Sequence, residues 1–302
     1  MSSNPRIPFE MSQDRRSYRP PQGFPLIVHV VVNVENWVFD EPMPRKLLPA
    51  PHGVEITPDV PNFSWAEYGM RCGMPRVIDA LKTVGVRASC TMNAAVINSY
   101  PRVAEVVLDA GWEFVGHGLH QRSLQSQAVQ EGALIADALA LLRGFSGQPV
   151  DGWLGPGLKE TGNTPDLLKY EGIRYCCDWV IDDLPAWMHT KYGPLIAMPY
   201  SLEINDSVLH AAHQHPSDEL LRRLTYTLET FDSELASNPR VLTIALHPHL
   251  IGVPHRITFL KQMFDLLRKR NDTIFMTGHE IADWFETVEP APSMEVVNRG
   301  AA

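Results

Sequence analysis

Cysteine is scarce in this sequence, long apolar runs are absent and positive charge is in the minority. The 302 residues include four cysteines, and none of them forms a C-x-x-C pair. A redox motif or a thiolate metal site is therefore not expected. We expect free, buried thiols, with Cys176 and Cys177 pointing to opposite faces of a strand.

These absences also exclude several classes of protein. The most apolar stretch, PLIVHVVVNV at 25–34, is too short to cross a bilayer, and residues 1–24 lack the continuous apolar core of a secretory signal. The formal net charge is −9, from 35 acidic and 26 basic residues. A field of that sign repels nucleic acid and anionic membranes. We expect a cytoplasmic protein that binds neither.

The sequence does contain apolar strand patterns that alternate with amphipathic helical patterns. This order predicts parallel strands joined by helices, in a closed barrel or an open doubly wound sheet. No glycine-rich phosphate turn follows the first strand, which counts against a dinucleotide-binding fold. Strands are predicted at 24–33, 86–92, 112–116, 152–154, 173–177, 194–199, 241–246 and 273–277. Helices are predicted at 74–84, 101–110, 128–145, 165–170, 217–236 and 256–269.

The chain divides into three parts. Residues 1–22 form an N-terminal arm, 23–290 a single α/β domain and 291–302 a C-terminal tail. Within the domain, the proline-rich, aperiodic segment 38–66 is expected to be a long loop over one mouth of the sheet.

Polar side chains follow most of the predicted strands. In a parallel barrel the carboxyl ends of the strands converge on one mouth, where barrel enzymes hold their active sites. Some of these residues have a simpler explanation: Glu35 could cap a loop, His120 could be solvated and His247 could be a core histidine. The polar residues are Asn33, Glu35, Asn93, His117, His120, Asp178, Asp182, Asp183, Tyr200, Asn205, Asp206, His247 and His249. Asp182 and Asp183 could be loop-capping carboxylates.

Several motifs occur in an order typical of one superfamily. They are NVEN (33–36), EYGMRCG (67–73), GHGLH (116–120), DDLPAW (182–187), MPYSLEIND (198–206) and LHPHLIG (246–252). On these motifs the chain resembles the polysaccharide deacetylase (NodB-homology) superfamily. It is most similar to the branch with deacetylase-type bacterial allantoinase and cyclic imide hydrolase. The resemblance implies a distorted seven-stranded (β/α) barrel and a homo-oligomer, with a tetramer as the suggested form.

The sequence departs from the metal-dependent members at their metal ligands. Those enzymes carry an Asp-x-Asp or Asp-Asp after the first strand, where this chain has Asn33 and Glu35. Their H-x-x-x-H motif is matched by His117, but its second position is Gln121, and a neutral amide is a poor ligand for a transition ion. We therefore expect no obligate cofactor. A weakly bound divalent metal such as zinc would use Glu35, His117 and His120.

The resemblance implies a hydrolase that opens a small cyclic amide, such as a cyclic imide, hydantoin or ureide, at a ring C–N bond. We assign Glu35 as the base that activates water and His247 as the acid for the leaving nitrogen, while His117 orients water or polarises the carbonyl. Asn205 and Asp206 would read the N–H and C=O edges of the ring. Further expected substrate contacts are Asn33, Arg71, His120, Trp187 and Tyr200, with Trp37 as another apolar wall.

Two other functions stay open at this point. The first is a metal-dependent N-deacetylase of a polysaccharide or amino sugar, with the metal on Glu35, His117 and either His120 or His247. The second is a barrel that binds a small molecule without catalysis.

Overall fold

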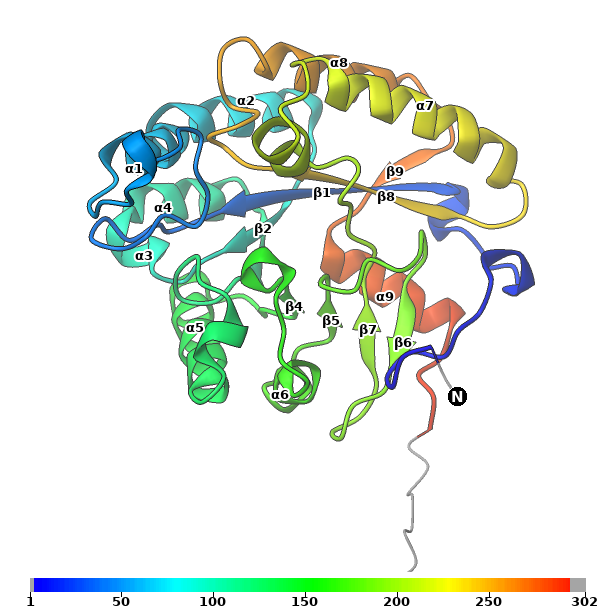
Figure 1. Cartoon of the computed structure of the whole chain (residues 1–302). Coiled ribbons are helices and arrows are strands. Elements are labelled where there is room, and N and C mark those ends of the chain that lie inside the picture. Colours follow the sequence, from blue (N-terminus) through cyan, green and yellow to red (C-terminus); the bar gives the residue numbers. More distant parts are fainter. Residues whose placement is uncertain (1–2, 294–302) are drawn as a thin grey trace, which may run out of the picture.

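Nine short strands form one curved sheet in residues 3–293, the part of the chain that the computed structural model describes (Figure 1). They are β1 (Leu26–Val34), β2 (Ser89–Met92), β3 (Glu113–Gly116), β4 (Gly152–Trp153), β5 (Tyr175–Cys176), β6 (Ala186–Met188), β7 (Leu195–Ala197), β8 (Arg240–Leu246) and β9 (Thr273–Phe275). The order across the sheet is β6-β7-β5-β4-β3-β2-β1-β8, and β9 also pairs with β1. All pairs are parallel except β6 with β7.

The two ends of the sheet meet through one bridge. Asn205, which follows β7, pairs in parallel fashion with Ala245 of β8. The sheet therefore curls into a distorted barrel, as predicted. Seven parallel strands form this ring, and two further short strands pair beside it, β6 with β7 and β9 with β1.

Most helices lie around the outside of this sheet, whereas α9 packs against the interior cluster (Figure 1). The helices longer than one turn are α1 (Val60–Tyr68), α2 (Met74–Val84), α4 (Pro101–Asp109), α5 (Glu131–Ser146), α6 (Thr164–Tyr170), α7 (Glu219–Glu234), α8 (Ile257–Arg268) and α9 (Gly278–Val288). Shorter elements are α3 (Val96–Ser99), the π-helices η4 (Gly69–Gly73) and η7 (Ser207–Ala212), and the 3-10 turns η1 (Ser12–Asp14), η2 (Pro21–Gly23), η3 (Pro51–Gly53), η5 (Leu124–Gln127) and η6 (Pro156–Leu158). Among the described residues, no helix is both long and apolar enough to cross a membrane.

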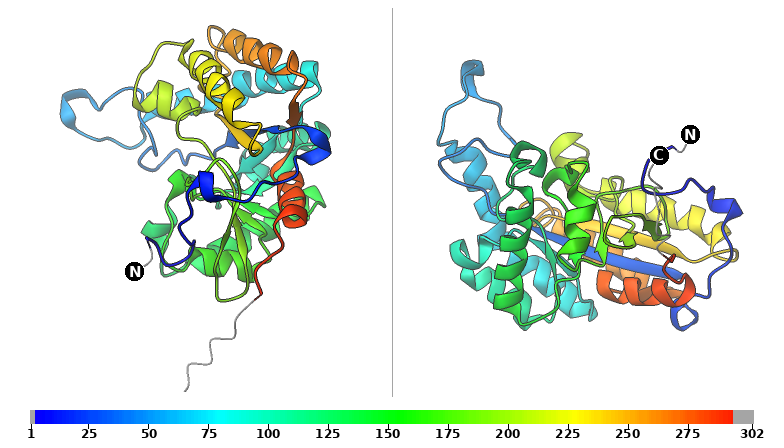
Figure 2. Two further views of the ribbon diagram at one scale, coloured as in Figure 1. Left: turned by 90° about the vertical axis from the view of Figure 1, so that its right-hand side faces the viewer. Right: turned by 90° about the horizontal axis from the view of Figure 1, so that it is seen from below.

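The eight predicted strands and six predicted helices are all present, whereas β6, α1, α3 and α9 were not predicted. The sequence does indicate where α9 begins, because Thr277 and Glu280 have the spacing of a capping box, which they form in the structure. The predicted loop 38–66 is wrong at its end, where α1 begins at Val60 with its N-cap at Asp59. The remainder of that segment projects away from the barrel (Figure 2).

Both faces of the long strands are buried, and alternate residues belong to different cores. The even-numbered residues of β1, such as Val30 and Val32, pack toward the helices. Ile27 and Val31 pack in the second cluster, inside the barrel. Cys176 and Cys177 likewise fall into different clusters, as predicted.

The predicted N-terminal arm, from residue 3 onward, lies along the barrel of its own chain (Figure 2). Arg6 forms an ion pair with Asp166 (3.0 Å). Tyr18 packs edge-on against Trp284 and Phe285 of α9. These contacts attach the arm to α6 and to α9. The last nine residues of the predicted C-terminal tail, 294–302, lie outside the described residues.

Candidate active site

Strand alternation places the three predicted catalytic residues on the interior side of the barrel. Glu35 continues the inward-facing series that includes Val31 and Asn33, two residues at a time. His247 follows Ala245, and His117 follows Val115, both in the interior cluster. All three side chains follow the carboxyl ends of parallel strands, so the sheet gathers them at one mouth, as predicted.

Glu35, His247 and Asp206 form a line of interacting side chains. His247 Nδ1 lies 2.6 Å from Asp206 Oδ1, and His247 Nε2 lies 3.6 Å from Glu35 Oε1. Asp206 is fully buried, and its other oxygen accepts the backbone N–H groups of His247 (2.8 Å) and Ile251 (3.2 Å). Because a carboxylate can only accept, His247 carries its proton at Nδ1 and directs Nε2 toward Glu35.

The charges around His247 favour its protonated form. Burial favours the neutral imidazole, but the charge and hydrogen bond of Asp206, with the charge of Glu35, raise the pKa of His247 above its usual value. A raised pKa keeps a larger fraction of the imidazolium at neutral pH. His247 can therefore act as a proton donor there.

Two N–H donors hold the carboxylate of Glu35. Trp37 Nε1 donates to Oε2 (2.8 Å), and Gln121 Nε2 donates to Oε1 (2.9 Å). Its side chain is about nine-tenths buried. The carboxylate is thus fixed in orientation, with Oε1 shared between Gln121 and the neighbouring His247.

His117 is held in a defined tautomer. Its Nδ1 lies 2.5 Å from the carbonyl oxygen of Leu154, so Nδ1 carries the hydrogen. Nε2 is buried and has no hydrogen-bond partner among the described residues. Burial lowers the pKa of His117, although the charge of Glu35 and the Leu154 carbonyl oppose this. Neutral His117 therefore presents Nε2 as an acceptor.

A small cavity of about 10 Å³ lies beside Glu35, with Asn33, Met70 and Pro248 in its lining. This is space for about one water molecule. Trp37 and His249 also line it, with their rings 5.6 Å apart, and Trp65 packs on His249 at 4.7 Å. One wall beside Glu35 is therefore aromatic.

Glycines allow the π-helix η4 to pack tightly against the segment that carries His247. A Cβ on Gly69 would lie 2.5 Å from the backbone nitrogen of His249, and a Cβ on Gly73 would lie 2.0 Å from the carbonyl oxygen of Pro248. A Cβ on Gly252 would likewise meet the Pro248 carbonyl oxygen and the Cα of Gly73. The glycines of the EYGMRCG and LHPHLIG motifs thus allow a close contact between the two segments. This contact fixes the position of the loop after β8.

Several predicted substrate contacts belong to the framework of the site. Asn33 accepts from Thr91 and donates to Tyr200 (3.2 Å) and to the Leu246 carbonyl (3.2 Å). Asn205 donates to Tyr200 and to the Ser201 carbonyl, and its oxygen accepts the N–H of Ser207. These amides are buried and their main hydrogen-bonding groups are used within the protein.

The structure gives Asp206 a different role from the one assigned to it. The sequence predicts that Asp206 hydrogen-bonds the substrate ring, but this residue has no exposed surface and its oxygens bind His247 and Ile251. Its position behind the histidine makes it a positioning residue.

Arg71 and Trp187 do not join the other residues. Arg71 pairs with Glu67 one turn earlier, and its side chain is 74% exposed. Trp187 lies on β6, where it packs against Phe285 and donates to the carbonyl of Glu289 (3.0 Å). Arg71 therefore extends into solvent, whereas Trp187 packs against the interior cluster at the β6 side of the sheet.

The carboxylates of the DDLPAW motif are also distant from Glu35. Asp182 accepts the backbone N–H of Leu184 (3.0 Å) and lies near Arg15 of the N-terminal arm (3.5 Å). This agrees with the loop-capping alternative. Together with Asp183 it borders a cavity of about 630 Å³ beside the arm, away from His117 and His247.

The predicted fallback metal ligands do not form a compact set. His120 Nδ1 is bonded to Asn36 (2.7 Å) rather than directed to the other two. Within residues 3–293, Glu160, Cys176 and Asp178 are the group of three such side chains whose ligand atoms lie within 4.8 Å of one another. Gln121 presents an N–H, not an oxygen, to Glu35. The donors at this mouth therefore fit a metal ion poorly.

The sequence gives no role to Trp65 and only a metal-ligand position to Gln121, which in fact holds Glu35. His249 is among the polar residues expected at strand ends, but without an assigned role. His249 and Trp65 line and support the aromatic wall. His249 comes two residues after His247, and the centroids of the two rings lie 5.8 Å apart. Burial and the charge of His247 hold the pKa of His249 well below its usual value, so it stays neutral.

Comparison with known proteins agrees with this architecture. No family model matches the chain. The peptidoglycan deacetylase of Helicobacter pylori is 22% identical over 240 residues, which cover 76% of this chain and 77% of that protein. The structure of a probable polysaccharide deacetylase from Pseudomonas aeruginosa superposes with a TM-score of 0.81 at 23% identity, over 92% of this chain and 97% of that one.

A second solved structure, that of the Puue allantoinase, also superposes with a TM-score of 0.81, at 24% identity and over 96% of both chains. The chain is thus similar to polysaccharide deacetylases and to an allantoinase at nearly full length. The resemblance to the polysaccharide deacetylase superfamily is confirmed, and the barrel is of that superfamily's type.

Proposed function

We propose that this protein is a hydrolase that opens a small cyclic amide at a ring C–N bond. The observation that carries the proposal is the line Asp206–His247–Glu35, in which a buried carboxylate orients an imidazole toward a second carboxylate. Such a line supplies both a proton acceptor and a proton donor at one mouth. Amide hydrolysis needs one of each.

Glu35 is the proposed base. Trp37 and Gln121 fix its carboxylate, and the adjacent cavity has room for about one water molecule. In this position the carboxylate can take a proton from water as the water attacks the ring carbonyl. His117 is proposed to support the same step, because its neutral, unpartnered Nε2 is an acceptor that can take a hydrogen bond from an attacking water. Orientation of water therefore suits His117 better than polarisation of the carbonyl.

His247 is the proposed acid. The Asp206 carboxylate holds Nδ1–H, which leaves Nε2–H of the imidazolium free to protonate the departing ring nitrogen. Because the pKa of His247 is raised, this form persists toward neutral pH. An ionised carboxylate and a protonated imidazole at the same mouth can act as base and acid in one reaction.

The second candidate is N-deacetylation of a polysaccharide or amino sugar. The similarity to a peptidoglycan deacetylase favours it, just as the similarity to the Puue allantoinase favours ring opening. The site favours ring opening, because Gln121 and Asn33 are amides that bind Glu35 and the protein framework instead of a metal ion.

The test compares both chemistries on chelator-treated protein. Succinimide, hydantoin, dihydrouracil and allantoin are assayed for ring opening, and oligomers of N-acetylglucosamine for release of acetate. We expect ring opening of at least one cyclic amide, and its loss in Glu35→Gln. Acetate release that needs an added metal, without ring opening, would support the deacetylase. Absence of both activities would support a non-catalytic binding barrel.

A further inference from the structure

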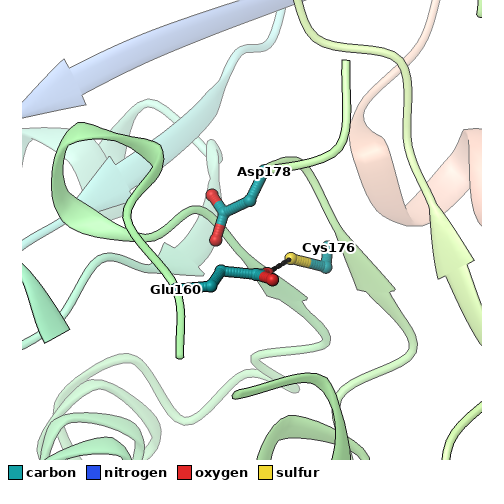
Figure 3. Close-up of side chains that lie close together, drawn as sticks. All are labelled: Glu160, Cys176 and Asp178. Carbon is teal, nitrogen blue, oxygen red and sulfur yellow. Dashed lines mark hydrogen bonds between the residues drawn. The ribbon is translucent and has the colours of Figure 1, made fainter. Parts of the chain in front are cut away.

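A second cluster of ionisable side chains lies on the other side of the barrel wall. Cys176 ends β5, Asp178 follows two residues later, and Glu160 comes from the loop after η6 (Figure 3). One ligand atom of each lies within 4.8 Å of the other two. Cys176 packs in the outer core cluster, whereas the active-site residues face the interior. The two groups of side chains are therefore separate.

This cluster lacks enough hydrogen-bond donors for its acidic groups. Asp178 Oδ1 accepts the N–H of Gly155 (2.7 Å), but Oδ2 is buried and has no partner among the described residues. Glu160 accepts Trp179 Nε1–H (2.9 Å) and a weak bond from the Cys176 thiol (3.4 Å). The side chain of Asp178 points toward Glu160 (Figure 3). Two carboxylates that face each other need a proton or a cation between them.

The surroundings supply little positive charge. The charge of Arg6 acts on Glu160, but its guanidinium is bonded to Asp166 (3.0 Å). Burial, with the charge of Glu160, raises the pKa of Asp178 well above its usual value, and burial raises that of Cys176 as well. All of these groups would be stabilised in their ionised forms by a dication.

We propose that Glu160, Cys176 and Asp178 bind a divalent transition metal, with zinc as the best match. A thiolate and two carboxylates are ligands that zinc accepts, and water can fill the remaining position of a tetrahedral site. Binding requires loss of the thiol proton, and metal coordination lowers thiol pKa enough for that.

The proposed site would be structural and lies close to the active-site framework. The metal would join the end of β5 to the loop after β4. Gly155, which donates to Asp178, directly follows Leu154, whose carbonyl holds His117. An ion at this position would thus stabilise the turn that orients His117, without touching Glu35 or His247.

Cobalt(II) provides a selective probe, because a cobalt–thiolate bond gives a near-ultraviolet charge-transfer band. None of Glu35, His117 and His247 can give such a band, and the serine variants below assign it to Cys176 among the free cysteines. Chelator-treated protein is titrated with cobalt(II), and zinc(II) is then added as a competitor. We expect about one cobalt ion per chain with the thiolate band, and displacement by zinc.

Two serine variants form a matched pair. Cys176→Ser should lose the band, whereas Cys177→Ser, whose side chain points into the other core, should keep it. Asp178→Asn should weaken cobalt binding at least tenfold while the protein stays folded by circular dichroism. Absence of a thiolate band in the wild type, or equal cobalt binding by Cys176→Ser, overturns the proposal. The carboxylates would then share a proton.

Discussion

The Nδ1 atom of His247 lies 2.6 Å from Oδ1 of Asp206, a residue 41 positions earlier in the chain. His247 follows β8 and Asp206 precedes the π-helix η7, and the bridge between Asn205 and Ala245 brings these segments together. A fully buried carboxylate beside an imidazole fixes its tautomer and favours its protonated form. The pH dependence of the proposed reaction should therefore depend on this pair.

His247→Asn should lower the catalytic rate by roughly two to four orders of magnitude, the usual contribution of one positioned acid or base. The wild type should show a bell-shaped profile of kcat against pH, whose alkaline limb reflects deprotonation of the imidazolium. That limb should flatten in the variant. A limb that persists unchanged would make His247 structural and would transfer the acid role to another group, with His117 the first to test.

Asp206→Asn should shift the alkaline limb instead of removing it. The charge of Asp206 is a main cause of the raised pKa of His247, so without it burial should pull that pKa down. The acid form is active below the pKa of His247 and is lost as the pH rises through it, so the limb should move to lower pH. The control is Asp182→Asn, which removes a carboxylate that lies near Arg15 instead of His247. This variant should leave the alkaline limb in place.

Glu35→Gln should abolish turnover while the protein remains folded, because it removes the base and keeps the shape of the side chain. Trp37→Phe offers a graded comparison, since it removes one donor to the Glu35 carboxylate and leaves the base itself. We expect the first variant to be inactive and the second to be only weakened. Both are measured by kcat and by the midpoint of thermal unfolding. Activity of Glu35→Gln within a few-fold of the wild type would remove Glu35 from the mechanism.

Gln121→His should strengthen binding of divalent transition ions at the mouth of the barrel. It places a second imidazole four residues after His117 and next to Glu35, where the present amide donates an N–H. Zinc affinity is measured by calorimetry in a Cys176→Ser background, so that the other cluster does not contribute. Equal affinity with and without the new histidine would show that position 121 does not face the same space as His117.

Gly73→Ala should destabilise the protein, because the added Cβ would meet the carbonyl oxygen of Pro248 at 2.0 Å. Overpacking of this kind costs roughly 1–3 kcal/mol. Activity should fall as well, since Pro248 directly follows His247. Gly144→Ala is a matched control on the exposed side of α5, where a Cβ meets nothing within 4 Å and should stabilise the helix by about 0.5–1 kcal/mol. The free energy of unfolding of both variants is measured by urea denaturation. A Gly73→Ala variant as stable as the wild type would mean that the loop after β8 can move to accommodate the added Cβ.

The sequence alone determined the order of the main strands and helices, since apolar periodicity is local and both faces of β1 and β8 are apolar. It also determined that Glu35, His117 and His247 gather at one mouth. Parallel strands in one sheet end on the same edge, and alternation fixes which side chains face inward. β6 and α9 were not predicted, although the Thr277 and Glu280 capping box marks the start of α9.

Only the tertiary structure decided what the other polar side chains do. Asp206 and Arg71 are both charged residues in motifs close to the site, yet Asp206 is fully buried behind His247 and Arg71 points to solvent. Gln121 turned out to hold Glu35, a residue 86 positions away. The direction of such side chains depends on how distant segments pack, through contacts such as Gly73 against Pro248 and Asn205 against Ala245. Local sequence patterns carry no information about those contacts, because each is formed by two segments far apart in the chain.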